Sequence, residues 1–219
     1  MNEATAPTLE ANPVLGESLP VRMSYAEFLK WEHPGIAEWV DGEVTVMSVK
    51  NEHQRVVDFL NRVIGFFVEM FGLGILRSAP YVMRTSEDAS GREPDLMFVT
   101  VGNAARMTSE QLNGPADLVI EVISEESVAR DRITKFEEYE AAGVREYWII
   151  DPRPNKQRTE FFILDETRRR FRPVPIGNDN IYRSTVIAGL WINVEWLWAE
   201  QPNAVAAFTE ITKSRGGLQ

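Results

Sequence analysis

The sequence of residues 117–124 is DLVIEVIS. It is apolar almost throughout, which is typical of a β-strand that is buried on both faces of a sheet. Alternation along a strand places Glu121 on the same face as Val119 and Ile123. A carboxylate in that position must leave water, at a considerable free-energy cost unless it is paired or binds a cation. Glu121 therefore indicates either a buried salt bridge or a functional site.

The pattern on both sides of this strand predicts an α/β fold with a mixed central β-sheet flanked by helices. Ser24 and Glu27 form a capping box that begins a short helix over 24–31, and Asp41-Gly42 marks the turn of a β-hairpin over 36–48. Further helices are expected at 51–71 and 131–142, the second ending at Gly143. The remaining strands are expected at 75–84, 94–101, 117–124, 144–152, 158–164, 169–174 and 182–188, the last three extending or covering the sheet.

The expected domain organisation is simple. Residues 1–22 mix Ala, Pro, Glu and Asn without a period and read as a flexible leader. Residues 23–198 form a single domain, and residues 199–219 form a C-terminal tail whose last dozen residues are frayed. No apolar run approaches the roughly 18 residues of a membrane span, and no signal-peptide pattern is present, so we expect a cytoplasmic protein without membrane partners.

The composition restricts the chemistry. There are 23 Lys and Arg against 33 Asp and Glu, a formal net charge of −10, which argues against nucleic-acid binding by bulk positive charge. The absence of cysteine excludes disulfides, zinc fingers, iron–sulfur sites and a thiol nucleophile. The histidines are His33 and His53 alone. A metal site must therefore be built mainly from oxygen ligands, which suit a hard cation such as Mg²⁺ or Mn²⁺.

A second carboxylate begins another strand. Asp95 follows Pro94 in REPDLMFV at 92–99, where the proline fixes the chain as it enters the strand. On its own the Pro-Asp pair is a common turn. Together, Asp95 and Glu121 in one sheet can hold one hard cation, which lowers the pKa of a bound water and polarises a phosphoryl oxygen.

The helix at 131–142 offers a cationic group. Asp131, Lys135 and Tyr139 lie at i, i+4 and i+8, which is one stripe of a helix. A solvated Asp–Lys pair would give the same spacing. Because the helix follows the glutamate strand after a short loop, Lys135 can return over the end of that strand, where it would orient a water and balance charge in the transition state. Tyr139 either donates to a phosphate or packs.

Several segments resemble a known family. They are EWVDGEV at 38–44, EHQRVV at 52–57, REPDLMFV at 92–99, ADLVIEVISEES at 116–127 and the run from Arg130 to Pro152, with STVIAGLWINVEWLW at 184–198 fitting the family's ending. These segments, in this order, are similar to the Uma-two family of restriction-endonuclease-like proteins, which belongs to the PD-(D/E)XK nuclease superfamily. The resemblance implies a restriction-endonuclease-like core with extra C-terminal strands.

The resemblance also implies roles for individual residues. Asp95 would be the aspartate of the PD half-motif and Glu121 the acid of the second half, and with the main-chain carbonyl of Val122 they would hold Mg²⁺ or Mn²⁺. The superfamily pattern expects a lysine at position 123, where this chain has Ile123. In similar families the lysine has moved to the next helix, and Lys135 is the matching residue.

Two further residues are implied by the resemblance to line the same cleft. Glu38 lies in the predicted hairpin, and a surface hairpin glutamate is the alternative interpretation. His53 lies near the start of the long helix, where a helix-start role is the alternative to substrate contact.

One segment could supply positive charge to a nucleic acid. Residues 153–172 carry seven basic and three acidic side chains, a net charge of 7 − 3 = +4. Arg168, Arg169 and Arg170 fall at the turn of a predicted hairpin, where they either grip a DNA backbone or form a solvated edge that prevents aggregation. The tryptophans of WINVEWLW indicate core packing or a homodimer interface.

The leading functional hypothesis is a metal-dependent endonuclease that hydrolyses phosphodiester bonds of DNA. A catalytically inactive binding or assembly protein with a nuclease fold is the second, supported by the acidic charge and by Ile123. A metal-dependent hydrolase of smaller phosphate esters is the third. Its substrate would not need the basic hairpin.

Overall fold

The computed structural model describes residues 21–32, 36–47, 50–86, 89–125 and 127–214, so nearly all of the expected leader lies outside the described residues. The helices are α1 (Tyr25–Phe28), α2 (Asn51–Met70), α3 (Lys135–Ala142) and α4 (Ala204–Ser214), with helical turns η1 (Val101–Arg106), η2 (Arg130–Thr134) and η3 (Val194–Trp198). None of the helices in these ranges combines the length and apolar character of a membrane span.

The strands belong to three sheets. The large sheet contains β4 (Gly74–Ser78), β7 (Leu96–Thr100), β9 (Leu118–Val122), β10 (Glu146–Asp151), β11 (Arg158–Asp165) and β12 (Arg170–Pro173). The small sheet contains β1 (Val21–Arg22), β2 (Ile36–Val40), β3 (Glu43–Met47), β5 (Val82–Arg84), β6 (Gly91–Arg92) and β8 (Gln111–Asn113). Strands β13 (Ile181–Arg183) and β14 (Trp191–Asn193) form a separate ribbon.

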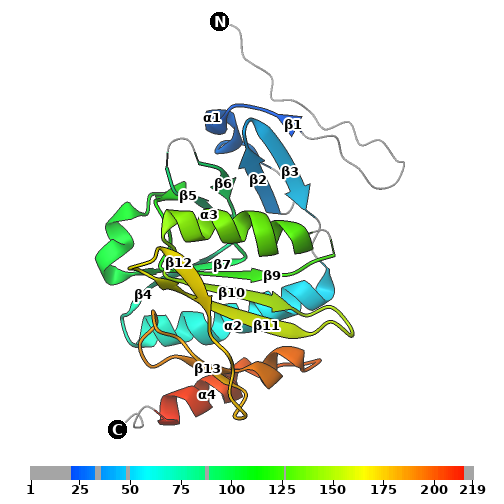
Figure 1. Cartoon of the computed structure of the whole chain (residues 1–219), viewed down its shortest axis with the longest axis vertical. Helices are drawn as coiled ribbons and strands as arrows, with labels where there is room; N and C mark the ends of the chain where they lie inside the picture. Colours follow the sequence, from blue (N-terminus) through cyan, green and yellow to red (C-terminus); the bar gives the residue numbers. More distant parts are fainter. Residues whose placement is uncertain (1–20, 33–35, 48–49, 87–88, 126, 215–219) are drawn as a thin grey trace, which may run out of the picture.

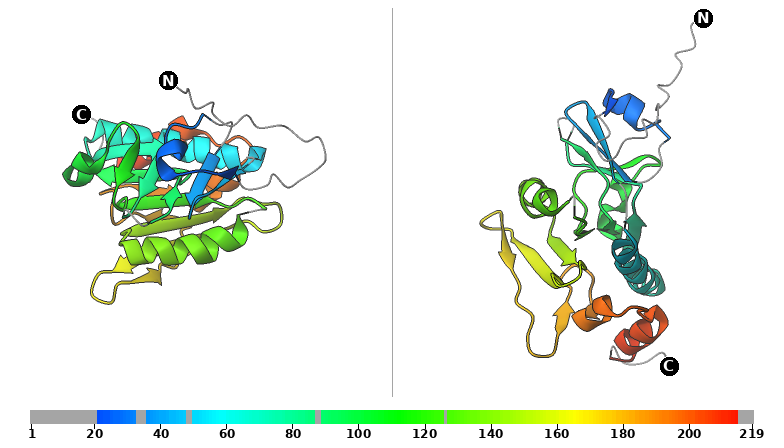
Figure 2. Two further views of the ribbon diagram at one scale, coloured as in Figure 1. Left: turned by 90° about the horizontal axis from the view of Figure 1, so that it is seen from above. Right: turned by 90° about the vertical axis from the view of Figure 1, so that its right-hand side faces the viewer.

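The large sheet confirms the predicted mixed sheet between helices. Its order is β12-β11-β10-β9-β7-β4, in which β9 and β10 run parallel and the other neighbours are antiparallel. Helix α3 covers one face, while α2 and then α4 cover the other (Figures 1 and 2). All five residues of β9 are buried. Leu118, Ile120 and Val122 pack into the core beneath α2, and Val119 lies in the core beneath α3, as the alternation predicts.

The expected single strand at 75–84 is wrong. Residues 74–78 pair with β7 in the large sheet, whereas residues 82–84 pair with β6 and β8 in the small sheet. The chain changes sheets at Ala79-Pro80, and proline lacks the main-chain N–H that a continuous ladder requires. The small sheet and α1 therefore pack as a separate layer beside the large sheet (Figure 2).

The helix predicted at 131–142 is confirmed, with one local difference. Its first turn, η2, is π-helical, and regular α-helix begins at Lys135. The main-chain carbonyl of Asp131 in this turn accepts a hydrogen bond from the Tyr147 hydroxyl. Gly143 ends the helix with φ of +90°, a conformation that glycine adopts at little cost.

The C-terminal region is more ordered than the sequence predicted. Residues 204–214 form α4, which packs on α2 and buries Ala204, Ala207 and Ile211. The expectation of a frayed tail is therefore wrong as far as Ser214. The three tryptophans of WINVEWLW are partly buried against the main core, so core packing accounts for them.

Candidate active site

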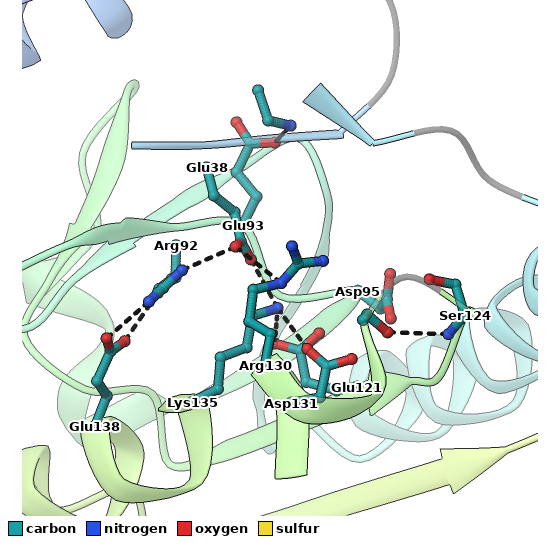
Figure 3. A network of polar contacts seen from close by, with 12 residues as sticks. Glu38, Arg92, Glu93, Asp95, Glu121, Ser124, Arg130, Asp131, Lys135 and Glu138 are labelled. Atoms are coloured by element: carbon teal, nitrogen blue, oxygen red, sulfur yellow. Dashed lines mark hydrogen bonds and ion pairs between the residues drawn. The ribbon is translucent and has the colours of Figure 1, made fainter. Parts of the chain in front are cut away.

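The centre of the site is a buried ion-pair cluster around Lys135. This ammonium lies 2.9 Å from Oε1 of Glu121, 2.7 Å from Oε1 of Glu38 and 3.1 Å from Oδ1 of Asp131. The four side chains come from β9, β2, η2 and α3, and each is at most 3% exposed (Figure 3). The i,i+4 spacing of the helix places Asp131 and Lys135 together, as predicted.

A second group of charges closes the cluster toward the small sheet. The Arg92 guanidinium donates to Oε2 of Glu38 at 2.9 Å and to both carboxylate oxygens of Glu138. Nε of Arg130 lies 3.4 Å from Oε2 of Glu38. Burial opposes ionisation of Glu38, but Lys135, Arg92 and Arg130 outweigh it and hold the pKa of that carboxyl below its ordinary value.

Asp95 lies at the other side of the site, where its Oδ2 accepts two hydrogen bonds. The main-chain N–H of Val122 donates to it at 2.7 Å, and Nε2 of His53 lies 3.1 Å away. The first contact fixes Asp95 against β9, and the second ties it to the start of α2. Among the described residues, no hydrogen bond reaches the other oxygen, Oδ1. The corresponding oxygen of Glu121 is Oε2, since Oε1 accepts from Lys135 and from the Tyr139 hydroxyl at 2.8 Å.

Asp95 and Glu121 share one small cavity of about 30 Å³. His53, Glu93, Val122, Ser124, Ser127, Arg130, Asp131 and Lys135 line it with them. This volume holds about two water molecules, or a cation and a water. The cavity therefore joins the two predicted carboxylates, the predicted lysine and His53 in one space.

The cluster contains more acid than base. Five buried carboxyl groups (Glu38, Glu93, Asp95, Glu121 and Asp131) face three cations, Arg92, Arg130 and Lys135. Burial raises the pKa of Glu121 to about 8 despite Lys135, and it raises the pKa of Glu93 to about 7; the neighbouring carboxylates add to both increases. Burial opposes the charge of Lys135 too, but the surrounding carboxylates hold its pKa well above the ordinary value.

This donor set fits a hard divalent cation. Mg²⁺ in proteins is held by one or two carboxylates and keeps several waters, and it would neutralise the surplus negative charge. Oδ1 of Asp95, Oε2 of Glu121 and the carbonyl of Val122 are the oxygen atoms that could hold it. Within the ranges that the structure describes, no three His, Asp or Glu side chains form a ready-made metal cage. Water would have to complete the coordination.

The structure does not bring every predicted site residue to this cavity. Nη1 of Arg170 bonds Glu140 at 2.6 Å, and Nη2 of Arg169 bonds the carbonyl of Ala141 at 3.3 Å. Arg168 is 81% exposed beside Asp165. These three arginines therefore lie at the C-terminal end of α3, whereas Asp131 and Lys135 lie at its beginning.

The sequence did not reveal several residues that line the cavity or, like Arg92, bond to the cluster beside it. Arg92 and Glu93 stand in the quoted REPD segment but were not assigned, and Arg130 directly precedes the predicted stripe. The Ser127 hydroxyl accepts a hydrogen bond from the main-chain N–H of Ser124 at 3.0 Å and so shapes the loop after β9. The sequence did carry a signal for Arg92, Glu93 and Arg130, because they are charged residues close to Asp95 or Asp131. Their roles depend on the position of the small sheet, and the sequence pattern did not predict that position.

Comparison with known proteins identifies the family. The model of the Uma2 family, described as "Putative restriction endonuclease", matches residues 25–195. The chain belongs to the Uma2 family. The crystal structure of a "putative nuclease belonging to DUF820" from Anabaena variabilis ATCC 29413 is similar, with a TM-score of 0.59 and 17% identity, covering 80% of this chain and 97% of that one. This likeness confirms the fold class. No curated protein sequence matches the chain.

Position 123 has a structural explanation in this Uma2 protein. Ile123 is 1% exposed and packs in the apolar cluster beneath α3, together with Val144 and Tyr147. The side chain of a lysine at position 123 would face this apolar core. The ammonium beside Glu121 comes instead from Lys135 on the next helix, at 2.9 Å.

Proposed function

We propose that this Uma2 protein is a metal-dependent endonuclease that hydrolyses phosphodiester bonds of DNA, with Mg²⁺ or Mn²⁺ held by Asp95 and Glu121. The observation that carries the proposal is the shared cavity with its surplus of buried carboxylates beside Lys135. Such a surplus is costly to a fold that only needs stability, because buried carboxylates require compensation. The family description supplies the reaction class.

The bound cation would lower the pKa of a water and withdraw charge from a phosphoryl oxygen. The chain supplies the remaining functions. Asp95 is held in one orientation by the N–H of Val122 and by His53, so its second oxygen points to a fixed place. Lys135 remains protonated in this cluster, and its ammonium orients the attacking water and stabilises charge on the phosphate.

Glu38 and Tyr139 position the lysine and the glutamate. Glu38 holds the Lys135 ammonium from the small sheet, and the Tyr139 hydroxyl donates to Glu121 from α3. Burial and the neighbouring carboxylates raise the pKa of Tyr139 well above its ordinary value, so this phenol stays protonated and remains a donor. We therefore propose both as positioning residues rather than as groups that contact the DNA.

Cleavage of plasmid DNA with Mg²⁺ or Mn²⁺ tests this function. Asp95→Asn, Glu121→Gln and Lys135→Met are each expected to lower the rate by at least about 100-fold, because each removes electrostatic stabilisation at the reacting phosphate. Glu69→Gln, an exposed carboxylate near the end of α2, is the matched control and should cleave like the wild type. Circular dichroism is to be used to check that each variant is folded.

The same preparation separates the alternatives. Calorimetric binding of Mn²⁺ that is lost in Asp95→Asn, with no cleavage of any DNA, would contradict the nuclease and favour a binding protein. Hydrolysis of bis-p-nitrophenyl phosphate without cleavage of DNA would favour an enzyme of smaller phosphate esters. Plasmid cleavage that persists in both Glu121→Gln and Lys135→Met would remove the site assignment.

A further inference from the structure

The cavity that holds the carboxylates is too small to hold the substrate. Its volume of about 30 Å³ accommodates an ion and water, but not a nucleotide. The reacting phosphate must therefore sit at its mouth, and the groups attached to that phosphate must lie in neighbouring space.

A larger hollow adjoins the cavity. Its volume is about 270 Å³, slightly below the usual range of about 300–1,000 Å³ for small-molecule pockets. Ile36, His53 and Asp95 line both spaces, so the hollow opens next to the carboxylate that would hold the cation. It extends along the first half of α2 and is closed by residues 78–80, where the chain changes sheets.

The walls of this hollow are polar but not basic. Gln54, Asp58 and Asn61 occupy one face of α2 at i, i+4 and i+7, and the Gln54 amide donates to Asp58 at 2.8 Å. No hydrogen bond of the Asn61 side chain is found among the described residues. The residues that line the hollow include no lysine or arginine. A phosphate within the hollow would face the Asp58 carboxylate without any basic side chain in the lining to compensate it.

The other walls are mainly apolar. They are formed by Ile36, Val57, Ser78, Ala79 and Pro80. His53, at the boundary with the cavity, is 7% exposed, and its Nδ1 is buried without a hydrogen-bond partner among the described residues. Apolar walls for a ring face, together with amides for a polar edge, are the features that proteins use to bind an exposed nucleobase.

We propose that this hollow receives one unpaired nucleobase of the substrate, adjacent to the phosphate that is cut. The proposal rests on the proposed nuclease function and specifies its substrate class. A base enters such a hollow only when its pairing edge is free. The enzyme therefore acts on single-stranded DNA, or on DNA with a locally unpaired nucleotide, in preference to a fully paired duplex.

Binding can be measured without cleavage by replacing Mg²⁺ with Ca²⁺. The probe is a short single-stranded oligonucleotide that carries 2-aminopurine at one position at a time, compared with the same sequence in a blunt duplex. We expect at least about tenfold tighter binding of the single strand and a fluorescence change confined to one or two positions. Cleavage of both probes with Mg²⁺ is measured in parallel.

Two variants test the hollow itself. The double variant Gln54→Ala/Asn61→Ala removes the amide edge, and Asn61→Trp fills the hollow from an exposed helix position. Both should weaken single-strand binding by roughly 5- to 100-fold, the range measured for loss of one stacked base. Asn178→Ala, an exposed amide in the loop before β13, is the matched control and should bind like the wild type.

Failure of this inference is distinguishable from failure of the nuclease proposal. Equal affinity for single strand and duplex, or full binding by both hollow variants, would overturn the base site even if plasmid is cleaved. Base-dependent binding that the variants weaken, without any cleavage, would support the hollow and contradict the nuclease proposal instead.

Discussion

Replacing Lys135 by methionine should strongly destabilise the folded chain in the absence of metal. The ammonium is 3% exposed and lies within 3.1 Å of the carboxylates of Glu38, Glu121 and Asp131. Methionine keeps most of the length of the side chain but removes its charge. The three acids then retain Arg92 and Arg130 near Glu38, while Glu121 and Asp131 lose their shared cation.

The expected magnitude follows from the burial of this cluster. Removing one partner of a buried ion pair costs about 3–5 kcal/mol, because the remaining charge is left without compensation. For a chain of this size, 1 kcal/mol corresponds to about 2–4 °C in the melting temperature, so Lys135→Met should melt about 6–20 °C below the wild type.

The difference in stability between Lys135→Met and the wild type should depend on pH. In the variant the Glu121 carboxyl loses the ammonium that opposes the effect of its burial, so its pKa in the folded state lies still further above its unfolded value. The folded state then binds more protons than the unfolded state. The stability of the variant therefore rises as the pH falls toward the ordinary carboxyl range. Lys135 itself, whose folded pKa is raised, contributes its stability throughout the pH range below its ordinary value of 10.5. The gap between the two proteins should be widest near pH 8 and narrowest near pH 5.

Urea unfolding and thermal melts at pH 5, 6.5 and 8, with a chelator present, measure this gap. Lys213→Met, an exposed lysine in the last turn of α4, is the control and should change the free energy of unfolding by less than about 0.5 kcal/mol. A Lys135→Met protein with wild-type stability at all three pH values would refute the view that this lysine neutralises the cluster.

Three further predictions concern other charged residues of the structure. Glu121→Gln should become more stable than the metal-free wild type as the pH rises from 5 to 8. Burial raises the pKa of Glu121 to about 8, so the free-energy penalty for ionising this carboxyl in the folded wild type grows over that interval. Urea midpoints of the two proteins that change in parallel with pH would contradict this. Glu146→Ala should lower the free energy of unfolding by about 3–5 kcal/mol and speed amide hydrogen exchange at 184–187. The reason is that the buried carboxylate accepts hydrogen bonds from Trp148, Ser184, Thr185 and Val186. Unchanged exchange would show that this carboxylate does not anchor the loop. In the plasmid assay, Arg168→Ala should alter the cleavage rate by less than about twofold, and Arg130→Ala should lower it by about tenfold or more. Of these two arginines, only Arg130 lines the cavity. A larger loss of rate in Arg168→Ala than in Arg130→Ala would restore the hairpin as the DNA contact.

The sequence was informative where one residue contradicted its local pattern. Glu121 interrupts an apolar strand, so its burial could be predicted from periodicity, whereas the spacing of Asp131 and Lys135 placed both on one helix face but left a solvated pair as an alternative. The structure places Nζ of Lys135 at 2.9 Å from Oε1 of Glu121. Local patterns of this kind survive folding because they reflect which face of an element is buried.

Contacts between distant elements could not be predicted in the same way. Arg92 bonds Glu38 and Glu138, residues that come together only because the small sheet packs beside α3. The spacing of apolar residues did not reveal that sheet, because it predicted a single strand over residues 75–84. The C-terminal helix was different, because Ala204, Ala207 and Ile211 already show helical spacing and could have predicted α4.

The bond between Glu38 and Lys135 has a consequence for synthesis of the chain. Glu38 belongs to an early hairpin, whereas Lys135 follows the central strand of the large sheet. A nascent chain that has emerged only as far as β9 carries Glu38, Asp95 and Glu121 without the lysine that compensates them. The proposed catalytic site is therefore incomplete on the ribosome until α3 has been made, and a chain released before that point would lack the cation that compensates these carboxylates.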